Sequence, residues 1–124
     1  TFGSLAPARL LDTRSGIGAP TGAVAPSGII HLQVLGQGGV PATGVSAVVV
    51  NITVTEPATG GYLTAYGDET TRRTASNRNF TAGQTVPNLV IAPVGANGKV
   101  NIYNGSGGNV QIIADVAGYF LWTP

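Results

Sequence analysis

The sequence predicts an all-β fold: a single-domain antiparallel β-sandwich, jelly-roll-like in layout, that takes up residues 1–124. Nineteen glycines and eight prolines interrupt the chain too often for long helices. Between these interruptions apolar and polar residues alternate with a period of two, as in half-buried strands. A chain of 124 residues has the length of one domain built around one hydrophobic core.

Six segments are the clearest strand candidates, because each is rich in β-branched or aromatic residues and is bounded by turn residues. In chain order they are Ile29–Leu35, Val45–Thr55, Gly61–Gly67, Asn88–Pro93, Lys99–Asn104 and Asn109–Phe120. The segments ARLLDTR (8–14) and SNRNF (76–80) are weaker candidates.

An internal similarity relates two of these regions. The segment NITVTEPATGGYLTAYG, from Asn51, aligns without a gap with NLVIAPVGANGKVNIYN, from Asn88, and this offset places Tyr66 on Tyr103. Each copy reads as strand, turn and strand. We therefore expect two equivalent hairpins within the sandwich.

Alternation along these strands assigns side chains to the two faces of the sheet. It places Leu63, Ala65, Val100 and Ile102 inward. The outward tyrosines, edged by hydroxyl and amide groups, could stack on a sugar ring, or they could simply pair across strands and shield the backbone. The candidate glycan platform consists of Tyr62, Thr64, Tyr66, Asn101, Tyr103 and Trp122.

Charge is scarce. Charged residues make up 9% of the chain, against about 25% in typical domains. The net charge of +1 and the single lysine, Lys99, argue against nucleic acid as a partner. A nearly neutral chain favours association between copies. No apolar run approaches the ~18 residues of a membrane-spanning helix, so we do not expect the chain to span a membrane.

Four of the charged residues lie together just after Gly67. Asp68, Glu69, Arg72 and Arg73 are expected at a solvated hairpin tip, where charges guard a neighbouring strand against unwanted edge pairing. A calcium site at Asp68 and Glu69 is the alternative, but the loop lacks the spaced ligands that calcium needs. We therefore expect no metal.

The motifs of the common enzyme classes are missing. His31 is the only histidine, no cysteine is present, and no serine lies in a GxSxG turn. The glycine-rich segments GQGGVP and GANGKV lack the residues of nucleotide-binding loops and read as turns. We expect a non-catalytic protein without a cofactor.

Two aspartates need cationic or amide partners. Asp12 lies between Arg9 and Arg14, and Asp115 interrupts an apolar strand. A carboxylate in an apolar strand requires a partner, so we expect Asp115 to pair with Arg9 or Arg14 and join the first strand to the last.

The segments ARLLDTR, GYLTAY, SNRNFTAGQTVPN, GKVNIYN and IADVAGYF, together with GQGGVPATGVSAVVVNITVTEP, run through nearly the whole chain. With them the sequence resembles a poorly characterised β-domain of secreted and cell-surface proteins from actinobacteria and related bacteria. The resemblance implies an extracellular, non-catalytic accessory module. The chain departs from it at Arg78 and in the closing LWTP.

Two functions remain open. The first is a structural or adhesive protein of the cell surface, whose copies associate through strand edges or termini into a filament or layer. The second is a carbohydrate-binding module of a secreted hydrolase, which would bind a surface polysaccharide. The absence of methionine is expected either of a processed, exported protein or of a piece of a longer one. Candidate self-association residues near the two ends are Phe2, Leu5, Phe120, Leu121 and Trp122.

Overall fold

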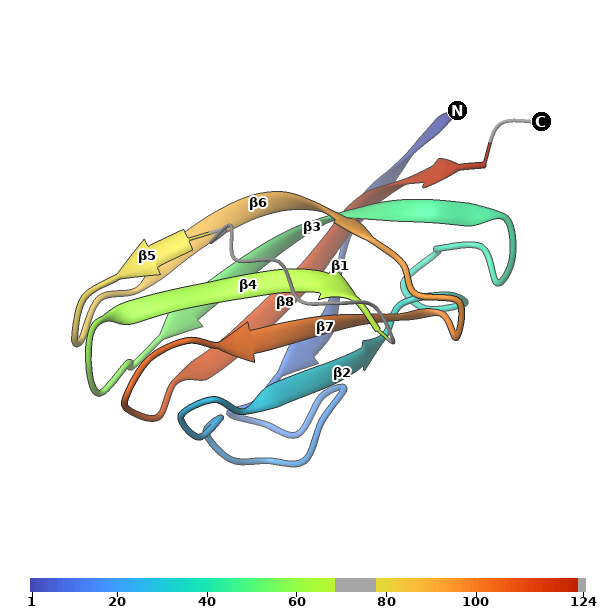
Figure 1. Cartoon of the computed structure of the whole chain (residues 1–124). Helices are drawn as coiled ribbons and strands as arrows, with labels where there is room; N and C mark the ends of the chain where they lie inside the picture. Colours follow the sequence, from blue (N-terminus) through green and yellow to red (C-terminus); the bar gives the residue numbers. More distant parts are fainter. Residues whose placement is uncertain (69–77, 123–124) are drawn as a thin grey trace.

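The protein is a sandwich of two four-stranded antiparallel sheets, which confirms the predicted fold class (Figure 1). The structure, a computed structural model, describes residues 1–68 and 78–122. Its strands are β1 (Phe2–Asp12), β2 (Ile29–Gln33), β3 (Val45–Thr55), β4 (Gly61–Gly67), β5 (Arg78–Phe80), β6 (Val86–Pro93), β7 (Lys99–Asn104) and β8 (Gln111–Leu121). Sheet A has the order β1-β8-β3-β6 and sheet B the order β2-β7-β4-β5.

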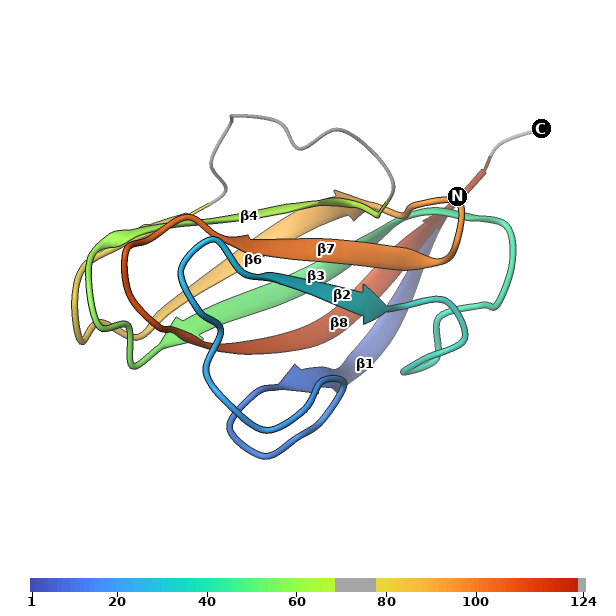
Figure 2. The ribbon, with the colours of Figure 1, turned by 60° about the horizontal axis from the view of Figure 1, so that its bottom comes forward.

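The strand order is that of a jelly roll. The first strand pairs with the last, β2 pairs with β7, β3 with β6, and β4 with β5. The two halves of the chain therefore run alongside each other in opposite directions, and the resulting long ribbon is folded over so that alternate pairs lie in opposite sheets (Figure 2). This is the double-sheet arrangement with Greek-key connections.

The predicted hairpins within the repeat are wrong. In each copy the two strands lie in opposite sheets, so that β3 does not pair with β4 and β6 does not pair with β7. Each copy is an arch from one sheet to the other. Sequence cannot separate an arch from a hairpin when the connection is a few turn residues, because both need the same strand, turn, strand pattern.

The two arches are equivalent only in their second strands. Ala65 pairs with Ile102, its counterpart in the repeat, and both contact the core. In the first strands, however, Ile52 is buried and its counterpart Leu89 is 63% exposed. A shift of one residue moves every side chain of a strand to the other face.

Two prolines explain why β6 has this register. In the β3–β6 pair, Val94 donates its backbone N–H to Ser46, which indicates that even-numbered residues of β6 bond to β3 and odd-numbered ones point away from it. Pro87 and Pro93 have no N–H and lie at odd positions of an edge strand, where none is needed. Along a strand, both the direction of the backbone N–H and the face of the side chain alternate from one residue to the next. Leu89 is at an odd position like the two prolines, and its side chain lies on the outer face.

The core lies between the sheets and is built mainly from β-branched side chains. Ile52 of sheet A and Leu63 and Ile102 of sheet B all point into it, as alternation predicted for the last two. The largest fully buried apolar side chains are Leu11, Val34, Val48, Val54, Val100, Ile102, Val110, Ile112 and Val116. No helix in the described residues is long and apolar enough to cross a membrane.

A buried asparagine holds the loops at one end of the sandwich. The amide nitrogen of Asn104 lies 3.1 Å from the carbonyl oxygens of Val24 and Ala25 and 2.9 Å from that of Gly108. Its side-chain oxygen accepts hydrogen bonds from the backbone and hydroxyl groups of Ser106. Asn104 begins an NGS triplet, the pattern of an N-glycosylation acceptor, but its amide is fully enclosed and has a structural role.

Replacing isoleucine by alanine should reduce stability strongly in the core and only slightly on the outer face of β6. Ile102→Ala should lower the free energy of unfolding by about 2–5 kcal/mol, because Ile102 is 1% exposed and the change leaves a cavity. The matched control Ile91→Ala should change it by less than ~0.5 kcal/mol, because Ile91 is 63% exposed. Urea unfolding of both variants checks the pair, and equal losses would contradict the assignment of faces.

Candidate functional site

The start of β1 and the end of β8 pair at one end of the sandwich, where β8 also pairs with the start of β3 (Figure 1). The name projecting ribbon is used for residues 2–4 and 118–121. Phe2 pairs with Phe120 across the ribbon, and their ring centroids are 5.1 Å apart. Phe2 is 51% exposed, and Trp122, directly after the ribbon, is 69% exposed. The ribbon therefore presents aromatic side chains to solvent.

The predicted self-association residues divide into two groups. Phe2 and Trp122 are exposed and Phe120 is half-buried. Leu5 and Leu121 instead pack against the core. The sequence found the aromatic members of this surface but did not distinguish them from the two leucines that close the sandwich.

An apolar band crosses the outer face of sheet A from the ribbon to the opposite edge. The ring of Phe2 lies over Gly118, where an added Cβ would come within 2.7 Å of it. Gly118 pairs with Val49, and Val49 pairs with Ile91 on the edge strand β6. The apolar band is defined as Phe2, Ala47, Val49, Leu89, Ile91 and Phe120.

Sequence reasoning missed Leu89, Val49 and Ile91 as surface residues. Segments such as VVV and LVIA are apolar at every position, so alternation does not say which side chains face out. Pro87, Leu89, Ile91 and Pro93 are alternate residues of one strand, so their side chains lie on the same face. The two prolines are therefore the signal in the sequence that could have identified Leu89 and Ile91 as surface residues. Large apolar side chains gathered on one exposed face are typical of protein–protein contacts.

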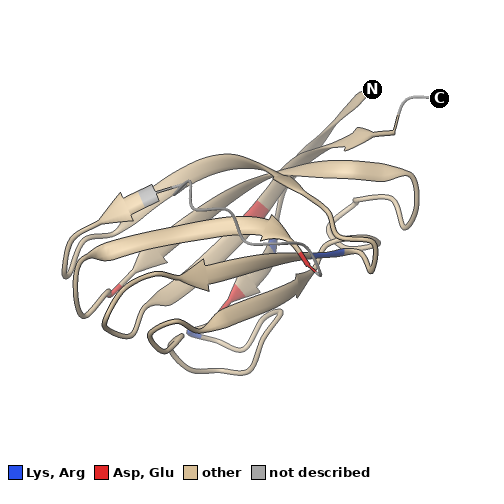
Figure 3. Cartoon of the chain, in the orientation of Figure 1, with Lys and Arg blue, Asp and Glu red and all other residues tan. Residues whose placement is uncertain are grey.

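This part of the surface carries no charge. No charged residue occurs before Arg9 or after Asp115, so the projecting ribbon is free of charged residues (Figure 3). Along sheet A the apolar band ends at a polar row formed by Arg9, Asp115 and Asn51, which are paired across three strands. Contact between two copies would therefore bury few ionic groups, which keeps the desolvation cost low.

The predicted glycan platform is largely closed. Its members other than Trp122 do lie on the outer face of sheet B, as alternation predicted, because Thr64 pairs with Tyr103 and Tyr66 with Asn101. Thr64, Tyr66 and Asn101 are nevertheless buried, with 3%, 9% and 4% exposed. The prediction of an open platform is wrong for these three residues, because alternation assigns a face and not the depth of its cover.

Of the predicted platform residues in sheet B, Tyr62 and Tyr103 remain half-exposed. Their ring centroids are 6.2 Å apart and the ring planes are tilted by 47°, so the two rings do not form one flat surface. Trp122 follows the end of β8 in sheet A and not in sheet B. Thr64 Oγ1 and Asn101 Oδ1 are buried and have no hydrogen-bond partner within the part of the chain that the structure describes.

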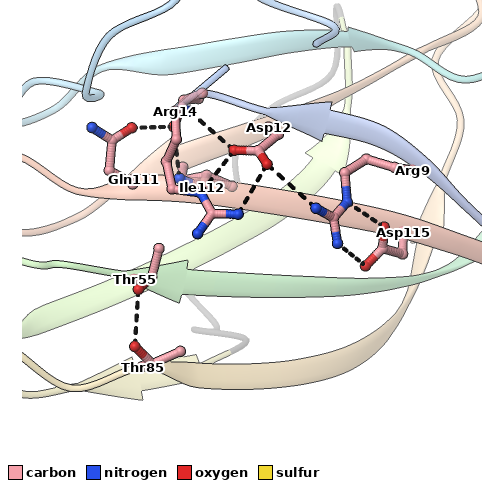
Figure 4. Close-up of polar contacts among 9 residues, drawn as sticks. Arg9, Asp12, Arg14, Thr55, Thr85, Gln111, Ile112 and Asp115 are labelled. Carbon is pink, nitrogen blue, oxygen red and sulfur yellow. Dashed lines mark hydrogen bonds and ion pairs between the residues drawn. The ribbon is translucent and has the colours of Figure 1, made fainter. Parts of the chain in front are cut away.

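Arg9 links the first strand to the last. Its Nε donates to Asp115 Oδ1 at 2.9 Å, and its Nη1 lies 3.3 Å from Asp12 Oδ2 (Figure 4). Of the two partners that the sequence left open for Asp115, it is therefore Arg9 that pairs with it. Arg14 instead binds Asp12 through Nε and Nη2, both at 3.0 Å.

Asp12 is the more enclosed of the two carboxylates. Its side chain is 6% exposed, against 25% for Asp115. The side-chain hydrogen bond from Arg14, together with its backbone hydrogen bond and its charge, lowers the pKa of Asp12 to about 2, although burial acts in the opposite direction. The same contact raises the pKa of Arg14.

Beside this ion-pair network, Thr13 joins β1 to β8 by neutral hydrogen bonds. Its hydroxyl donates to Gln111 Oε1 at 2.6 Å and accepts from the backbone N–H of Ile112 at 2.9 Å. Thr13 is completely buried. The end of β1 is thus fixed to β8 by charged contacts on the surface and by a hydroxyl in the interior.

His31 contacts a carboxylate but no nucleophile. Its Nδ1 lies 3.1 Å from Asp68 Oδ1, and Asn97 donates to Asp68 Oδ2 at 2.7 Å. These contacts join β2 to the ends of the neighbouring strands. Within residues 1–68 and 78–122, no hydroxyl group forms a hydrogen bond with His31.

The same described residues hold no cluster of three or more metal-ligating side chains. Of the charged residues predicted at the hairpin tip and for a calcium site, Glu69, Arg72 and Arg73 lie outside the described residues. Asp68 is the one described member, and its contacts include those with His31 and Asn97.

Comparisons with known proteins add no family. A scan of the chain against protein-family models gives no match, and a search of curated proteins gives no similar protein. The resemblance to a β-domain of secreted bacterial proteins stays a prediction.

The lowered pKa of Asp12 predicts an acid-sensitive contribution to stability at the end of β1. Because the folded pKa of about 2 lies below the usual value of 3.8, the contribution to stability is complete above pH 4 and is lost as the pH falls through about 2. Asp12→Asn should therefore flatten the stability profile between pH 4 and pH 2. Thermal unfolding across this range measures the effect, and an unchanged acid limb would contradict it.

Loss of the ion pair between Arg9 and Asp115 should have only a small effect on stability. Both side chains are partly solvated, so Asp115→Asn should cost no more than about 1 kcal/mol and lower the melting temperature by a few degrees. The charge-reversed pair Arg9→Asp with Asp115→Arg should recover part of the loss. An unchanged melting temperature in Asp115→Asn would show that this ion pair does not stabilise the junction of β1 with β8.

Proposed function

We propose that this protein is a non-catalytic structural domain of the cell exterior, whose copies associate through the projecting ribbon and the apolar band into a filament or layer. The observation that carries the proposal is the band itself. Large apolar side chains extend from Phe2 to Leu89 across one exposed sheet face, without a charged residue among them.

The energetics favour association at this face. Burying a large apolar side chain contributes about 1.5–3 kcal/mol, and the band holds several such side chains. The band lies on the outer face of a sheet, so another sheet could pack against it at the usual spacing of about 10 Å. With a net charge of +1, repulsion between copies is weak.

The edge of β6 is a poor site for adding a strand from another copy. Pro87 and Pro93 lack N–H groups at the positions that point away from β3, and only Leu89 and Ile91 lie between them on that side. Of the routes that the sequence suggested, association through the termini is therefore better supported than pairing along this edge.

The geometry of the contact decides between a closed dimer and a filament. Contact of the band with the same band on another copy gives a closed pair, whereas contact of the ribbon with a different patch leaves both ends open and repeats. The ribbon lies at one end of the sandwich, at the two termini of the described chain (Figure 1). This asymmetry supports an open, repeating assembly.

Sedimentation velocity over a range of concentrations tests the proposal. The wild-type protein should form larger species as concentration rises, and Phe2→Ser combined with Ile91→Ser should shift this transition to at least tenfold higher concentration, as the loss of buried apolar area implies. The matched control Ile29→Ser replaces an exposed isoleucine on sheet B and should leave the transition unchanged.

Electron microscopy of the native material then distinguishes the forms of assembly. Filaments or sheets with a repeat of one domain support an open contact. A wild-type protein that stays monomeric at every concentration, with isolated particles in the micrographs, would overturn the proposal.

A further inference from the structure

A second surface feature lies apart from the apolar band, on the side of the sandwich where β1 and β2 form the edges of opposite sheets. It is a cavity of about 240 Å³. Its lining comes from these two strands and from the loops that follow them: Arg9, Leu10, Ile17, Gly18, Leu32, Gln33, Gln37 and Gly38.

The walls of the cavity are fixed by backbone hydrogen bonds. Ile17 and Asp12 exchange two of them, at 2.9 and 3.1 Å, which closes the turn after β1. On the other side, Gln37 donates to the carbonyl of Val34 and accepts from the N–H of Val40. The cavity is therefore formed before any ligand enters, as is usual for small-molecule sites.

The positive charge of Arg9 is already neutralised. Arg9 and Arg14 are matched by Asp12 and Asp115, all within one network, so the network as a whole carries no net charge. An anion would have to compete with two carboxylates for the guanidinium group. The electrostatics thus favour a neutral ligand.

Hydrogen-bonding capacity remains in three side chains. The contacts of Arg9 involve three of the five guanidinium N–H groups, which leaves two donors. Gln33 uses its nitrogen on the carbonyl of Leu35, which leaves its oxygen as an acceptor. The side chain of Gln37 has no hydrogen bond to another described residue, so both its donors and its acceptor are available.

Apolar groups complete the site. Leu10 and Leu32 are buried beneath it, and Ile17 is 43% exposed at its wall. A neutral ligand with several hydroxyl groups and one apolar face matches this combination of amides, guanidinium and aliphatic side chains. A volume below the range of about 300–1,000 Å³ typical of drug-sized ligands restricts it to one ring.

We propose that this cavity binds one ring of a neutral sugar, with Gln33 and Gln37 as the amide ligands and Arg9 as a donor. The proposal does not depend on self-association. It places sugar binding at the edge between the sheets and not at the tyrosines of sheet B, where the sequence suggested a platform.

The test is a titration of the ¹⁵N-labelled protein with glucose, galactose, mannose, arabinose and N-acetylglucosamine, each at millimolar concentrations. At least one sugar should shift the side-chain amide resonances of Gln33 and Gln37 in a saturable way. Gln37→Leu should weaken binding by about tenfold, the usual effect of lost hydrogen bonds. The matched control Asn109→Leu changes an exposed amide away from the cavity and should leave binding unchanged.

Two results would overturn the proposal. The first is that none of the five sugars shifts these resonances. The second is that binding persists in Gln37→Leu but is lost in Tyr62→Ala or Tyr103→Ala, which would place the sugar on the outer face of sheet B. Gln37 is exposed and its backbone bonds do not involve the side chain, so a misfolded Gln37→Leu variant is not expected, and a wild-type-like spectrum would verify this.

Discussion

The pairing of β8 with both β1 and β3 is the constraint on which the rest of the fold depends. It joins the last strand of the chain to the first and places β8 in the middle of sheet A. Contacts between residues so far apart in sequence carry a large loop-closure cost, which burial of the strands must offset. Ile112, Ala114 and Val116 supply that burial from β8, and Thr13 and Arg9 fix the register beside them.

The same pairing creates the surface that we propose for association. At the end of this strand pair Tyr119 and Leu121 pack against the core, whereas Phe2 and Phe120 lie on the outer face of sheet A and contact each other. The prolines of β6 act at the other side of the sheet by turning Leu89 and Ile91 outward. Two independent features, a long strand pair and an edge strand that contains two prolines, thus place apolar side chains on one face.

Polar groups mark the limits of this apolar surface. The ion-pair network of Arg9 with Asp12 and Asp115 stabilises the junction of β1 and β8, and it also neutralises the side of the cavity between the sheets. One cluster therefore serves the fold and determines what kind of ligand the cavity could accept. The face of sheet B is different, because its polar residues Thr64 and Asn101 are enclosed and cannot contact a large ligand directly.

The sequence by itself determined the all-β class, the positions of most strands and the inward side chains of β4 and β7, because a period of two is a local property of the chain. It also indicated the contact between Asp115 and an arginine, since a carboxylate in an apolar strand needs a partner. Only the tertiary structure decided which strands pair, that the repeat forms arches, and that Tyr66 is enclosed while Leu89 is exposed. These outcomes depend on the register and on the layers that cover each face, and neither is encoded in the alternation of a single strand.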